Sequence, residues 1–338
     1  MRGEGGLVAG TVSDGSAPWQ RILAAAVRDP AELARRLGVE VAPAAAGDFP
    51  LLVPEGYLAR IRPGDPADPL LLQVLPQAAE LAPQPEGYSV DPLAESDCAS
   101  VPGLLRKYAG RALLVTTGAC AIHCRYCFRR HFPYAELPRG RAWWDAAVAA
   151  IAADPSIEEV LLSGGDPLTL PDRQLAALAA ALAEVPQVRR LRIHTRLPIV
   201  IPERVDAALV GWLAGGRLEP VVVVHANHPR EIAADVAAAL RRLREAGVTV
   251  LNQSVLLRGV NDAAATLAEL SQALFAAGCL PYYLHALDRV RGAAHFAVAD
   301  DRALAIHADL AARLPGYLVP RLVREVPGAP GKTPLTGP

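Results

Sequence analysis

Residues 113–131 read LLVTTGACAIHCRYCFRRH, an apolar run followed directly by a loop that holds three cysteines. The run is short, uninterrupted and ended by glycine, which is typical of a buried β-strand. In parallel α/β folds, the loops that follow the strands surround the open end of the sheet, where ligands bind. We therefore expect Cys120, Cys124 and Cys127 at a ligand-binding edge of a sheet.

Apolar runs of the same kind recur along the chain and alternate with alanine-rich, amphipathic stretches. The predicted strands are residues 113–117, 159–163, 190–195, 220–226, 248–254 and 281–287. The predicted helices are residues 142–153, 172–183, 203–213, 231–246, 263–277 and 300–314. Such alternation predicts a parallel sheet with helices outside, which right-handed crossovers curl toward a barrel. A closed barrel needs eight such units, so the prediction is an α/β fold with a partial (β/α)6 barrel.

The chain is expected to divide into three regions. Residues 1–105 are irregular and rich in proline, which lacks an N–H donor and fixes φ. They predict a wrapping N-terminal extension that is helical near 19–37 and 54–61. Residues 106–315 form the partial barrel, and residues 316–338 form a C-terminal segment.

Composition argues against several classes of protein. The 338 residues include 34 basic and 35 acidic side chains, and this formal charge of −1 does not favour nucleic acid or an anionic membrane. No apolar run reaches the length of a membrane span, and the first residues, MRGEGG, do not resemble a signal segment. Five cysteines are an odd number for a disulfide-bonded secreted domain. The sequence predicts a cytoplasmic protein without nucleic-acid or membrane partners.

The cysteine cluster has the spacing C-x3-C-x2-C, which indicates a binding site for a soft metal centre. A structural zinc ion needs four closed ligands, which His123 or His131 would have to complete. A [4Fe–4S] cluster held by three thiolates would instead leave one iron open to another ligand. The simplest alternative is that these are ordinary buried thiols without a ligand. Three cysteines within eight residues at a strand end argue against it.

Polar residues also follow the other predicted strands. They are Gly164, Gly165 and Asp166 after the second strand, Arg196 after the third, His225 and Asn227 at the fourth, Gln253 at the fifth and Asp288 after the sixth. The carboxyl ends of parallel strands meet at one edge, so these residues are expected to converge on the cysteine loop.

The cysteine motif, with Tyr126 beside its last cysteine, resembles the signature of the radical S-adenosylmethionine (SAM) superfamily. The resemblance implies a [4Fe–4S] cluster whose open iron binds the methionyl amino and carboxylate groups of SAM, which is then cleaved to a 5′-deoxyadenosyl radical. Residues 160–167, VLLSGGDP, resemble the glycine-rich segment of that superfamily. This implies that Ser163, Gly164, Gly165 and Asp166 contact SAM.

Residues 325–334, EVPGAPGKTP, resemble a further motif, that of the lysine 2,3-aminomutase family. In that family a lysine after a glycine-rich stretch forms the Schiff base with pyridoxal 5′-phosphate (PLP), and Lys332 would be this lysine. The resemblance spans nearly the whole chain, including residues 124–134 (CRYCFRRHFPY) and 251–262 (LNQSVLLRGVND). It is nearest to the short aminomutases that make (R)-β-lysine for modification of translation elongation factor P.

The resemblance assigns further cofactor contacts. Arg111, with Lys107 and Tyr108 nearby, would meet the PLP phosphate, where a cationic fork suits the anion. His225 and Gln253 would lie against SAM. Without the surrounding motifs, Arg111 could equally be a surface charge and His225 a buried side chain at a strand end.

The same resemblance assigns the substrate contacts. Arg129 would pair with the carboxylate of the substrate, and Asp288 and Glu325 would receive the distal ammonium of lysine. Asp288 alone could equally be a helix N-cap.

Catabolic members commonly carry aspartate in place of Glu325 and extend further with zinc-binding cysteines, so a zinc site is not expected here. Cys98 and Cys279 receive no role.

The implied activity is an isomerase that converts L-α-lysine into (R)-β-lysine, using the cluster, SAM and PLP. The implied partners are L-lysine, an electron donor such as flavodoxin or ferredoxin, and elongation factor P with its ligase. Three alternatives stay open at this stage: an aminomutase for another basic amino acid, a radical SAM enzyme without PLP, and a non-enzymatic zinc-clip protein.

Overall fold

The computed structural model describes residues 17–40, 49–137 and 141–336, and strands from these ranges form one ten-stranded sheet. The strands are β1 Ala99–Val101, β2 Leu104–Tyr108, β3 Arg111–Thr117, β4 Glu159–Gly164, β5 Arg190–Thr195, β6 Glu219–Val224, β7 Thr249–Val255, β8 Leu280–His285, β9 Arg321–Arg324 and β10 Thr333–Pro334. They follow one another in chain order across the sheet. Pairing is parallel from β3 to β9 and antiparallel at both ends.

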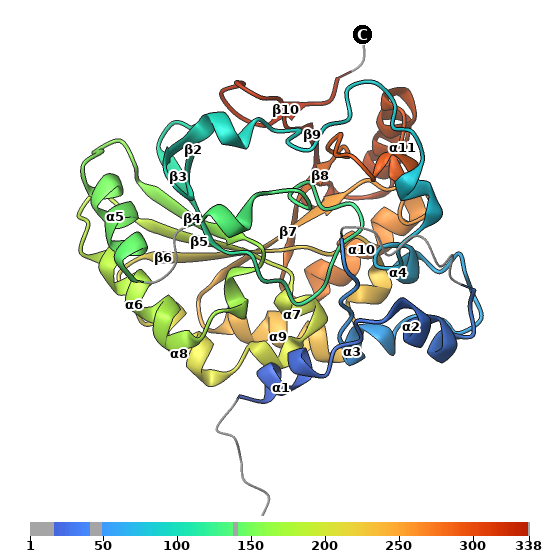
Figure 1. Cartoon of the computed structure of the whole chain (residues 1–338), viewed down its shortest axis with the longest axis horizontal. Coiled ribbons are helices and arrows are strands. Elements are labelled where there is room, and N and C mark those ends of the chain that lie inside the picture. The colour runs from blue at the N-terminus through green and yellow to red at the C-terminus, as the bar shows by residue number, and fades with distance from the viewer. Residues whose placement is uncertain (1–16, 41–48, 138–140, 337–338) are drawn as a thin grey trace, which may run out of the picture.

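The six expected βα units are confirmed as β3 to β8 with their helices. The helices are α5 Arg141–Ala152, α6 Asp172–Ala183, α8 Ala207–Ala214, α9 Ala234–Glu245, α10 Ala264–Ala276 and α11 Asp300–Arg313. They lie on the outside of the curved sheet (Figure 1). Helix α8 begins later than predicted because Pro202–Arg204 forms a separate 3-10 turn and Asp206 caps α8 by accepting from the Leu209 N–H at 2.9 Å.

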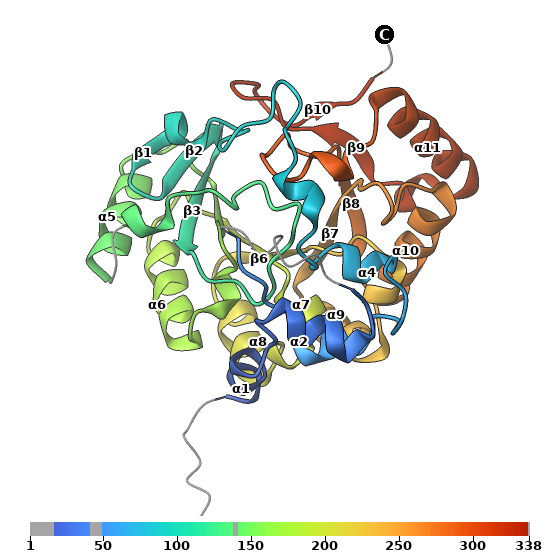
Figure 2. The ribbon, with the colours of Figure 1, turned by 45° about the vertical axis from the view of Figure 1, so that its right-hand side comes forward.

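The sheet curves into an open barrel, which Figure 2 shows with its helices around it. Among the described residues no ladder of hydrogen bonds joins β1 to β10. Buried aliphatic side chains of the strands, such as Leu114, Leu162 and Ile193, pack with the inner faces of the helices in one large core. No helix in the described ranges has the length and apolar character needed to cross a bilayer.

The sheet is longer than the sequence predicted. Strand β2 crosses the expected boundary at residue 105 and pairs with β3, while β9 follows the boundary at residue 315 and pairs with β8. The expected division into extension, barrel and C-terminal segment stays a prediction, but the sheet is continuous across both boundaries.

The helix expected over residues 19–37 is wrong in one respect, since the structure has two helices there. Helix α1 spans Pro18–Ala24 and α2 spans Pro30–Leu37, and the break lies at Pro30, which occupies the first position of α2 behind the cap Asp29. The stretch 54–61 contains the short helix α3 Glu55–Leu58. Residues 1–16 and 41–48 of the expected extension lie outside the described residues.

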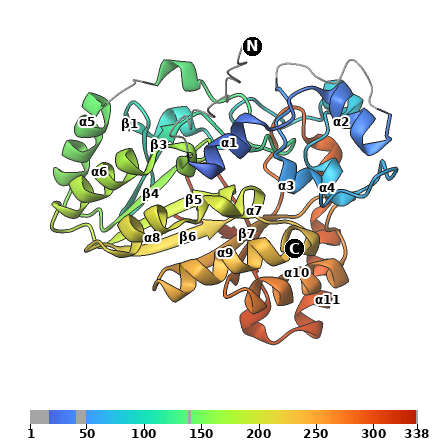
Figure 3. The ribbon, with the colours of Figure 1, turned by 90° about the horizontal axis from the view of Figure 1, so that it is seen from below.

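The N-terminal segment packs beside the cysteine loop. The backbone N–H groups of His123 and Arg125 donate to the carbonyls of Leu52 (3.1 Å) and Gln73 (2.9 Å). Gln73 follows helix α4 Pro69–Leu72, and in the view of Figure 3 helices α1 to α4 lie above α9 to α11. The extension therefore supports the loop that carries the three cysteines.

Candidate active site

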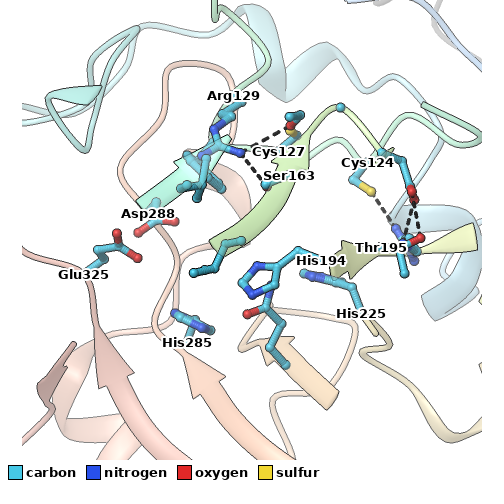
Figure 4. Close-up of a pocket in the computed structure, with 18 of the residues that line it drawn as sticks. Cys124, Cys127, Arg129, Ser163, His194, Thr195, His225, His285, Asp288 and Glu325 are labelled. Atoms are coloured by element: carbon cyan, nitrogen blue, oxygen red, sulfur yellow. Dashed lines mark hydrogen bonds between the residues drawn. The ribbon is translucent and has the colours of Figure 1, made fainter. Parts of the chain in front are cut away.

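One pocket lies inside the barrel, and every site residue predicted from the sequence lines it. They are Lys107, Tyr108, Arg111, Cys120, Cys124, Cys127, Arg129, Ser163, Gly164, Gly165, Asp166, His225, Gln253, Asp288, Glu325 and Lys332. Figure 4 draws 18 of the lining residues and labels ten of them, with Cys124, Cys127 and Arg129 on one side and His194, His225 and His285 on the other. The sequence therefore identified the members of one pocket, although their individual roles stay predictions.

The three cysteines lie in the loop after β3. Burial raises the pKa of the Cys127 thiol to about 12, and neighbouring Cys124 adds to this rise. Burial also raises the pKa of Cys120, with contributions from Cys127 and Asp166. Arg196 Nη1 lies 2.7 Å from Cys124 Sγ. The thiols are thus close enough to disfavour one another's charged form, and a strongly cationic centre would be needed to hold all three as thiolates.

Two glycines let the end of β4 approach this loop. A Cβ on Gly165 would lie 2.3 Å from the Ala119 carbonyl oxygen, and one on Gly164, whose φ is +135°, would lie 2.4 Å from that of Thr117. The Gly165 N–H donates to the Thr117 carbonyl at 2.8 Å. Close packing against the cysteine loop is therefore a structural reason for the Gly-Gly pair, beside the predicted approach of SAM.

Asp166 joins the end of β4 to the turn after β5. Its carboxylate accepts from the Thr195 hydroxyl (2.7 Å) and from the N–H groups of Arg196 (2.7 Å), Leu197 (3.1 Å) and Leu168 (3.0 Å). These four donors occupy both oxygens, so the side chain fixes the relative position of two strand ends. This supporting role is what the structure adds to the predicted contact with SAM.

His225 lies on an aromatic wall of the pocket. Its ring stacks on Tyr126, with centroids 5.7 Å apart and an interplanar angle of 20°, and its Nε2 lies 3.2 Å from the Tyr126 hydroxyl. Burial, aided by the Arg196 guanidinium, lowers the pKa of His225 to about 3. At neutral pH the imidazole is therefore uncharged. Gln253 of β7 lines the same pocket.

Two acidic groups of the pocket, Asp288 and Glu325, differ in charge state. Glu325 lies between two ammonium groups: Lys332 Nζ donates to its Oε2 at 2.6 Å, and Lys107 Nζ donates to its Oε1. Burial alone would raise the pKa of Glu325, but Lys332 and Lys107 outweigh it and hold this pKa below its usual range. Burial, together with the charge of Glu325, raises the pKa of Asp288 to about 7.

The residues around Lys332 supply aromatic and cationic surfaces. The Lys332 ammonium lies 5.7 Å from the centroid of the Tyr283 ring, and the Arg111 guanidinium lies 4.9 Å from that of Tyr108. Asp288 follows β8 in a loop, and no helix of the described chain begins there, so the helix N-cap alternative is wrong.

Arg129 is held by partners that the sequence did not predict. Its Nε and Nη2 donate to Glu95 Oε2 (2.6 Å) and Oε1 (2.8 Å), and its Nη1 donates to the Ser163 hydroxyl (2.8 Å). Glu95 begins a 3-10 turn in the N-terminal segment, far from the barrel motifs in sequence. No local pattern marks it, since its partner lies 34 residues away.

Comparison with known proteins agrees with this geometry. Residues 114–270 match the Radical SAM superfamily. The chain is 50% identical over 323 residues to the L-lysine 2,3-aminomutase of Escherichia coli (strain K12), covering 94% of each chain. It is 48% identical to the L-lysine 2,3-aminomutase of Haemophilus influenzae, covering 93% of this chain and 94% of the relative.

The chain belongs to the L-lysine 2,3-aminomutase family. The enzyme of that name from Clostridium subterminale is 39% identical, and the match covers 82% of this chain and 67% of the relative. Among solved structures, a radical SAM methyltransferase from Sphaerobacter thermophilus matches with a TM-score of 0.44 and 20% identity, covering 65% of this chain and 68% of the methyltransferase.

The family uses a [4Fe–4S] cluster and SAM, and the cysteine loop fits the cluster. The three thiols line one wall of the pocket, and burial together with neighbouring thiols raises the pKa of Cys120 and of Cys127. Iron would supply the positive charge that this donor set lacks. Cys120, Cys124 and Cys127 would hold the cluster, and three protein thiolates would leave one iron open for another ligand.

The zinc alternative does not fit. His123 Nδ1 lies 2.9 Å from the Pro50 carbonyl oxygen, and His131 Nε2 lies 3.2 Å from that of Arg291. Across the described ranges, no three His, Cys, Asp or Glu side chains, the three cysteines included, lie close enough together to hold a single metal ion, whereas a [4Fe–4S] cluster offers a separate iron to each thiolate. The four ligands of a structural zinc site are therefore not assembled there.

The Lys332 side of the pocket fits PLP, which the family also uses. Arg192 Nε, His194 Nε2 and His285 Nε2 are buried there without a hydrogen-bond partner. A buried polar group left unpaired costs about 1–3 kcal/mol, so these atoms indicate a polar ligand. An amine, a guanidinium at Arg111 and several free polar groups match the aldehyde and phosphate of PLP. Sequence analysis missed both histidines, although each follows an apolar residue on a predicted strand.

The two remaining cysteines lie away from the three-thiol loop. Cys98 lies on the same 3-10 turn as Glu95, and its thiol is 3.5 Å from the Ala94 carbonyl oxygen. Cys279 is completely buried in the core, and burial raises its pKa. Both are free thiols, so neither forms a disulfide.

Proposed function

We propose that this protein is an isomerase that converts L-α-lysine into (R)-β-lysine. The observation that carries the proposal is one pocket that combines the three-thiol loop, Lys332 and the acidic pair Asp288–Glu325. Sequence identity of 50% over nearly the full length of a named L-lysine 2,3-aminomutase supports it. The radical SAM enzyme without PLP and the zinc-clip protein are both less consistent with this combination.

Substrate choice rests on the charges at the two ends of the pocket. Glu325 is anionic, and Asp288 becomes anionic above about pH 7, so together they favour a distal ammonium. An acidic side chain there would meet like charge, which disfavours glutamate as a substrate. Arg129 is the group proposed to receive the α-carboxylate, with a guanidinium that is only 5% exposed. Ornithine and arginine are the runner-up substrates.

The protein's part in catalysis is to bind and orient. When bound, the cluster and SAM supply a carbon-centred radical that takes hydrogen from the substrate β-carbon, and PLP carries the nitrogen as it moves to C3. Cys120, Cys124 and Cys127 would hold the cluster, and Lys332 would hold PLP until lysine replaces it. The buried walls keep water away from the reactive species and fix the distance between them.

Reduction with borohydride tests the proposal most directly. Protein loaded with PLP should be labelled at Lys332 alone, as mapped by mass spectrometry of its peptides, and a Lys332→Ala variant should lose the label. Anaerobic incubation with reductant, SAM, PLP and lysine should then yield β-lysine. Label at another lysine, or no β-lysine from an enzyme with an intact cluster, would contradict the proposed aminomutase activity. Parallel reactions with ornithine and arginine decide the substrate.

The cellular role proposed is supply of (R)-β-lysine for elongation factor P, in the cytoplasm, with flavodoxin or ferredoxin as electron donor. Likeness to the short branch of the family supports this, as do five free thiols. Co-expression with elongation factor P and its ligase should add β-lysine to elongation factor P, visible as a mass increase. Unmodified elongation factor P beside an active aminomutase would argue for another use of β-lysine.

A further inference from the structure

Glu95 is a buried carboxylate that the N-terminal segment contributes to the pocket. It is 3% exposed and begins the 3-10 turn Glu95–Cys98. Asp91 fixes this turn, because its carboxylate accepts from the N–H groups of Glu95 (3.0 Å) and Ser96 (3.1 Å). The preceding Ala94 has φ +50°, a conformation that non-glycine residues rarely adopt. The turn therefore holds the Glu95 side chain in one place.

Glu95 accepts hydrogen bonds from only two of the three guanidinium nitrogens of Arg129. Arginine has five N–H groups. Glu95 accepts from Nε and Nη2, and Nη1 donates to the Ser163 hydroxyl and, at 3.4 Å, to the Gly164 carbonyl. Among the described residues Nη2 donates only to Glu95, so its second hydrogen is left for a ligand. The arginine is thus oriented by the protein and still able to bind.

Charges of alternating sign continue from this pair to Lys332. Glu95 lies 3.6 Å from Lys107 Nζ, Lys107 also donates to Glu325, and Glu325 accepts from Lys332. These three cations and two carboxylates together carry one positive charge while neighbouring Asp288 is protonated. An incoming carboxylate would neutralise it without removal of Glu95. Departure of Glu95 before a ligand binds would leave the buried Arg129 without a carboxylate partner among the described residues, which is strongly unfavourable.

We propose that Glu95 is a positioning residue for the substrate carboxylate, which it serves by fixing the orientation of Arg129. Glu95 stays in place while the ligand binds, rather than competing with it for the guanidinium. The inference rests on the proposed function, because it takes Arg129 as the group that receives the carboxylate of lysine. It extends the active site to the N-terminal segment, which supplies a charge that the barrel lacks at this point.

The test uses the enzyme loaded with cluster, SAM and PLP, and three substitutions. Glu95→Gln keeps the shape but removes the charge, and Glu95→Asp keeps the charge but shortens the side chain. Asp97→Asn, an exposed acid on the same turn, is the control. For each variant the KM and kcat for lysine are measured. Binding of 6-aminohexanoate, which has the carboxylate, and of cadaverine, which lacks it, is measured by anaerobic calorimetry.

Glu95→Gln should raise the KM for lysine and the Kd for 6-aminohexanoate by about 10- to 100-fold, since orientation of a charged binding group is lost. Cadaverine affinity, iron content and PLP absorbance should stay unchanged, Glu95→Asp should lose less than Glu95→Gln, and Asp97→Asn should match the wild type. Equal weakening of cadaverine, or a lower KM for lysine, would overturn the proposal.

If Glu95→Gln does not fold, the aspartate variant decides by the same comparison of 6-aminohexanoate with cadaverine. Failure of the proposed function is recognised separately, because the wild-type enzyme would then bind neither lysine nor 6-aminohexanoate. Wild-type binding together with unaltered Glu95 variants would reject the role of Glu95 alone.

Discussion

Asp288 and Glu325 are two carboxyl groups in one pocket with different proton affinities. Glu325 keeps its charge because two ammonium groups contact it, whereas burial and the charge of Glu325 raise the pKa of Asp288 to about 7. The sequence predicted both residues from a resemblance, but not this difference. It arises from the distances to Lys107 and Lys332, which the chain brings together only on folding.

Asp288 should make lysine binding dependent on pH. A carboxyl group with a pKa of about 7 is protonated below that pH and cannot pair with an ammonium group, so the KM for lysine should rise as pH falls below 7. Asp288→Asn should raise KM by about tenfold or more, because a hydrogen bond between charged groups contributes about 1.5–3 kcal/mol. Steady-state kinetics between pH 6 and 8.5 check this. A variant that keeps the wild-type KM and pH profile would refute the role.

The residues missed by sequence analysis share one property. Glu95, His194 and His285 belong to no local chemical pattern, and each matters because of what lies across the pocket. The cysteines were found because their chemistry is local, with three thiols within one loop. Long-range pairing of charges is invisible in the spacing of residues along the chain.

At the scale of elements, the end of β4 packs tightly against the cysteine loop. Gly165→Ala would place a carbon 2.3 Å from the Ala119 carbonyl oxygen, so one of the two segments must move. The expected result is a loss of about 1–3 kcal/mol in the free energy of unfolding, with reduced iron content after anaerobic reconstitution. Iron analysis and urea denaturation measure both.

Gly211→Ala in helix α8 is the matched control, because an added Cβ there meets no atom within 4 Å. Alanine in a helix is favoured over glycine, so this variant should be as stable as the wild type or slightly more stable. Full iron loading of Gly165→Ala would show that the loop tolerates the displacement.

Prediction succeeded for strands β3 to β8 and failed for the strands at the sheet ends. Each of the six parallel strands contains buried apolar residues, and β4 has a continuous apolar run, so these segments stand out in the sequence. Strands β5 and β7 also carry polar residues that line the pocket, such as Arg192, His194 and Gln253. Strands β1, β2, β9 and β10 are short or polar, and β10 has only two residues, one of them proline. They form because a neighbouring strand offers hydrogen bonds, which no local pattern records.

For the whole molecule, Arg204 connects the N-terminal extension to the barrel. Its guanidinium is fully buried, lies 4.7 Å from the centroid of the Trp19 ring of α1, and donates to Asp172 of α6 at 2.7 Å. Arg204→Ala should lower the free energy of unfolding by about 3–5 kcal/mol, as removal of a buried ion-pair partner does. Chemical denaturation followed by tryptophan fluorescence measures the loss.

Arg313→Ala is the control for that variant, because Arg313 pairs with Asp309 on an exposed face of α11. Exposed pairs contribute little to stability, so this substitution should leave the denaturation midpoint near that of the wild type. Equal effects of the two substitutions would mean that Arg204 does not connect the extension to the barrel.

The sequence by itself determined the α/β class and the six βα units, since hydrophobic periodicity encodes these, and its motifs and family resemblance identified residues that line one pocket. Only the tertiary structure decided how far the sheet extends, which carboxyl group keeps its charge, and that Glu95 of the extension holds Arg129. The physical reason is the same in each case. Hydrogen bonds at sheet edges and charges in a buried pocket act between residues that are distant in sequence, and their strength depends on separation and burial that exist only after folding.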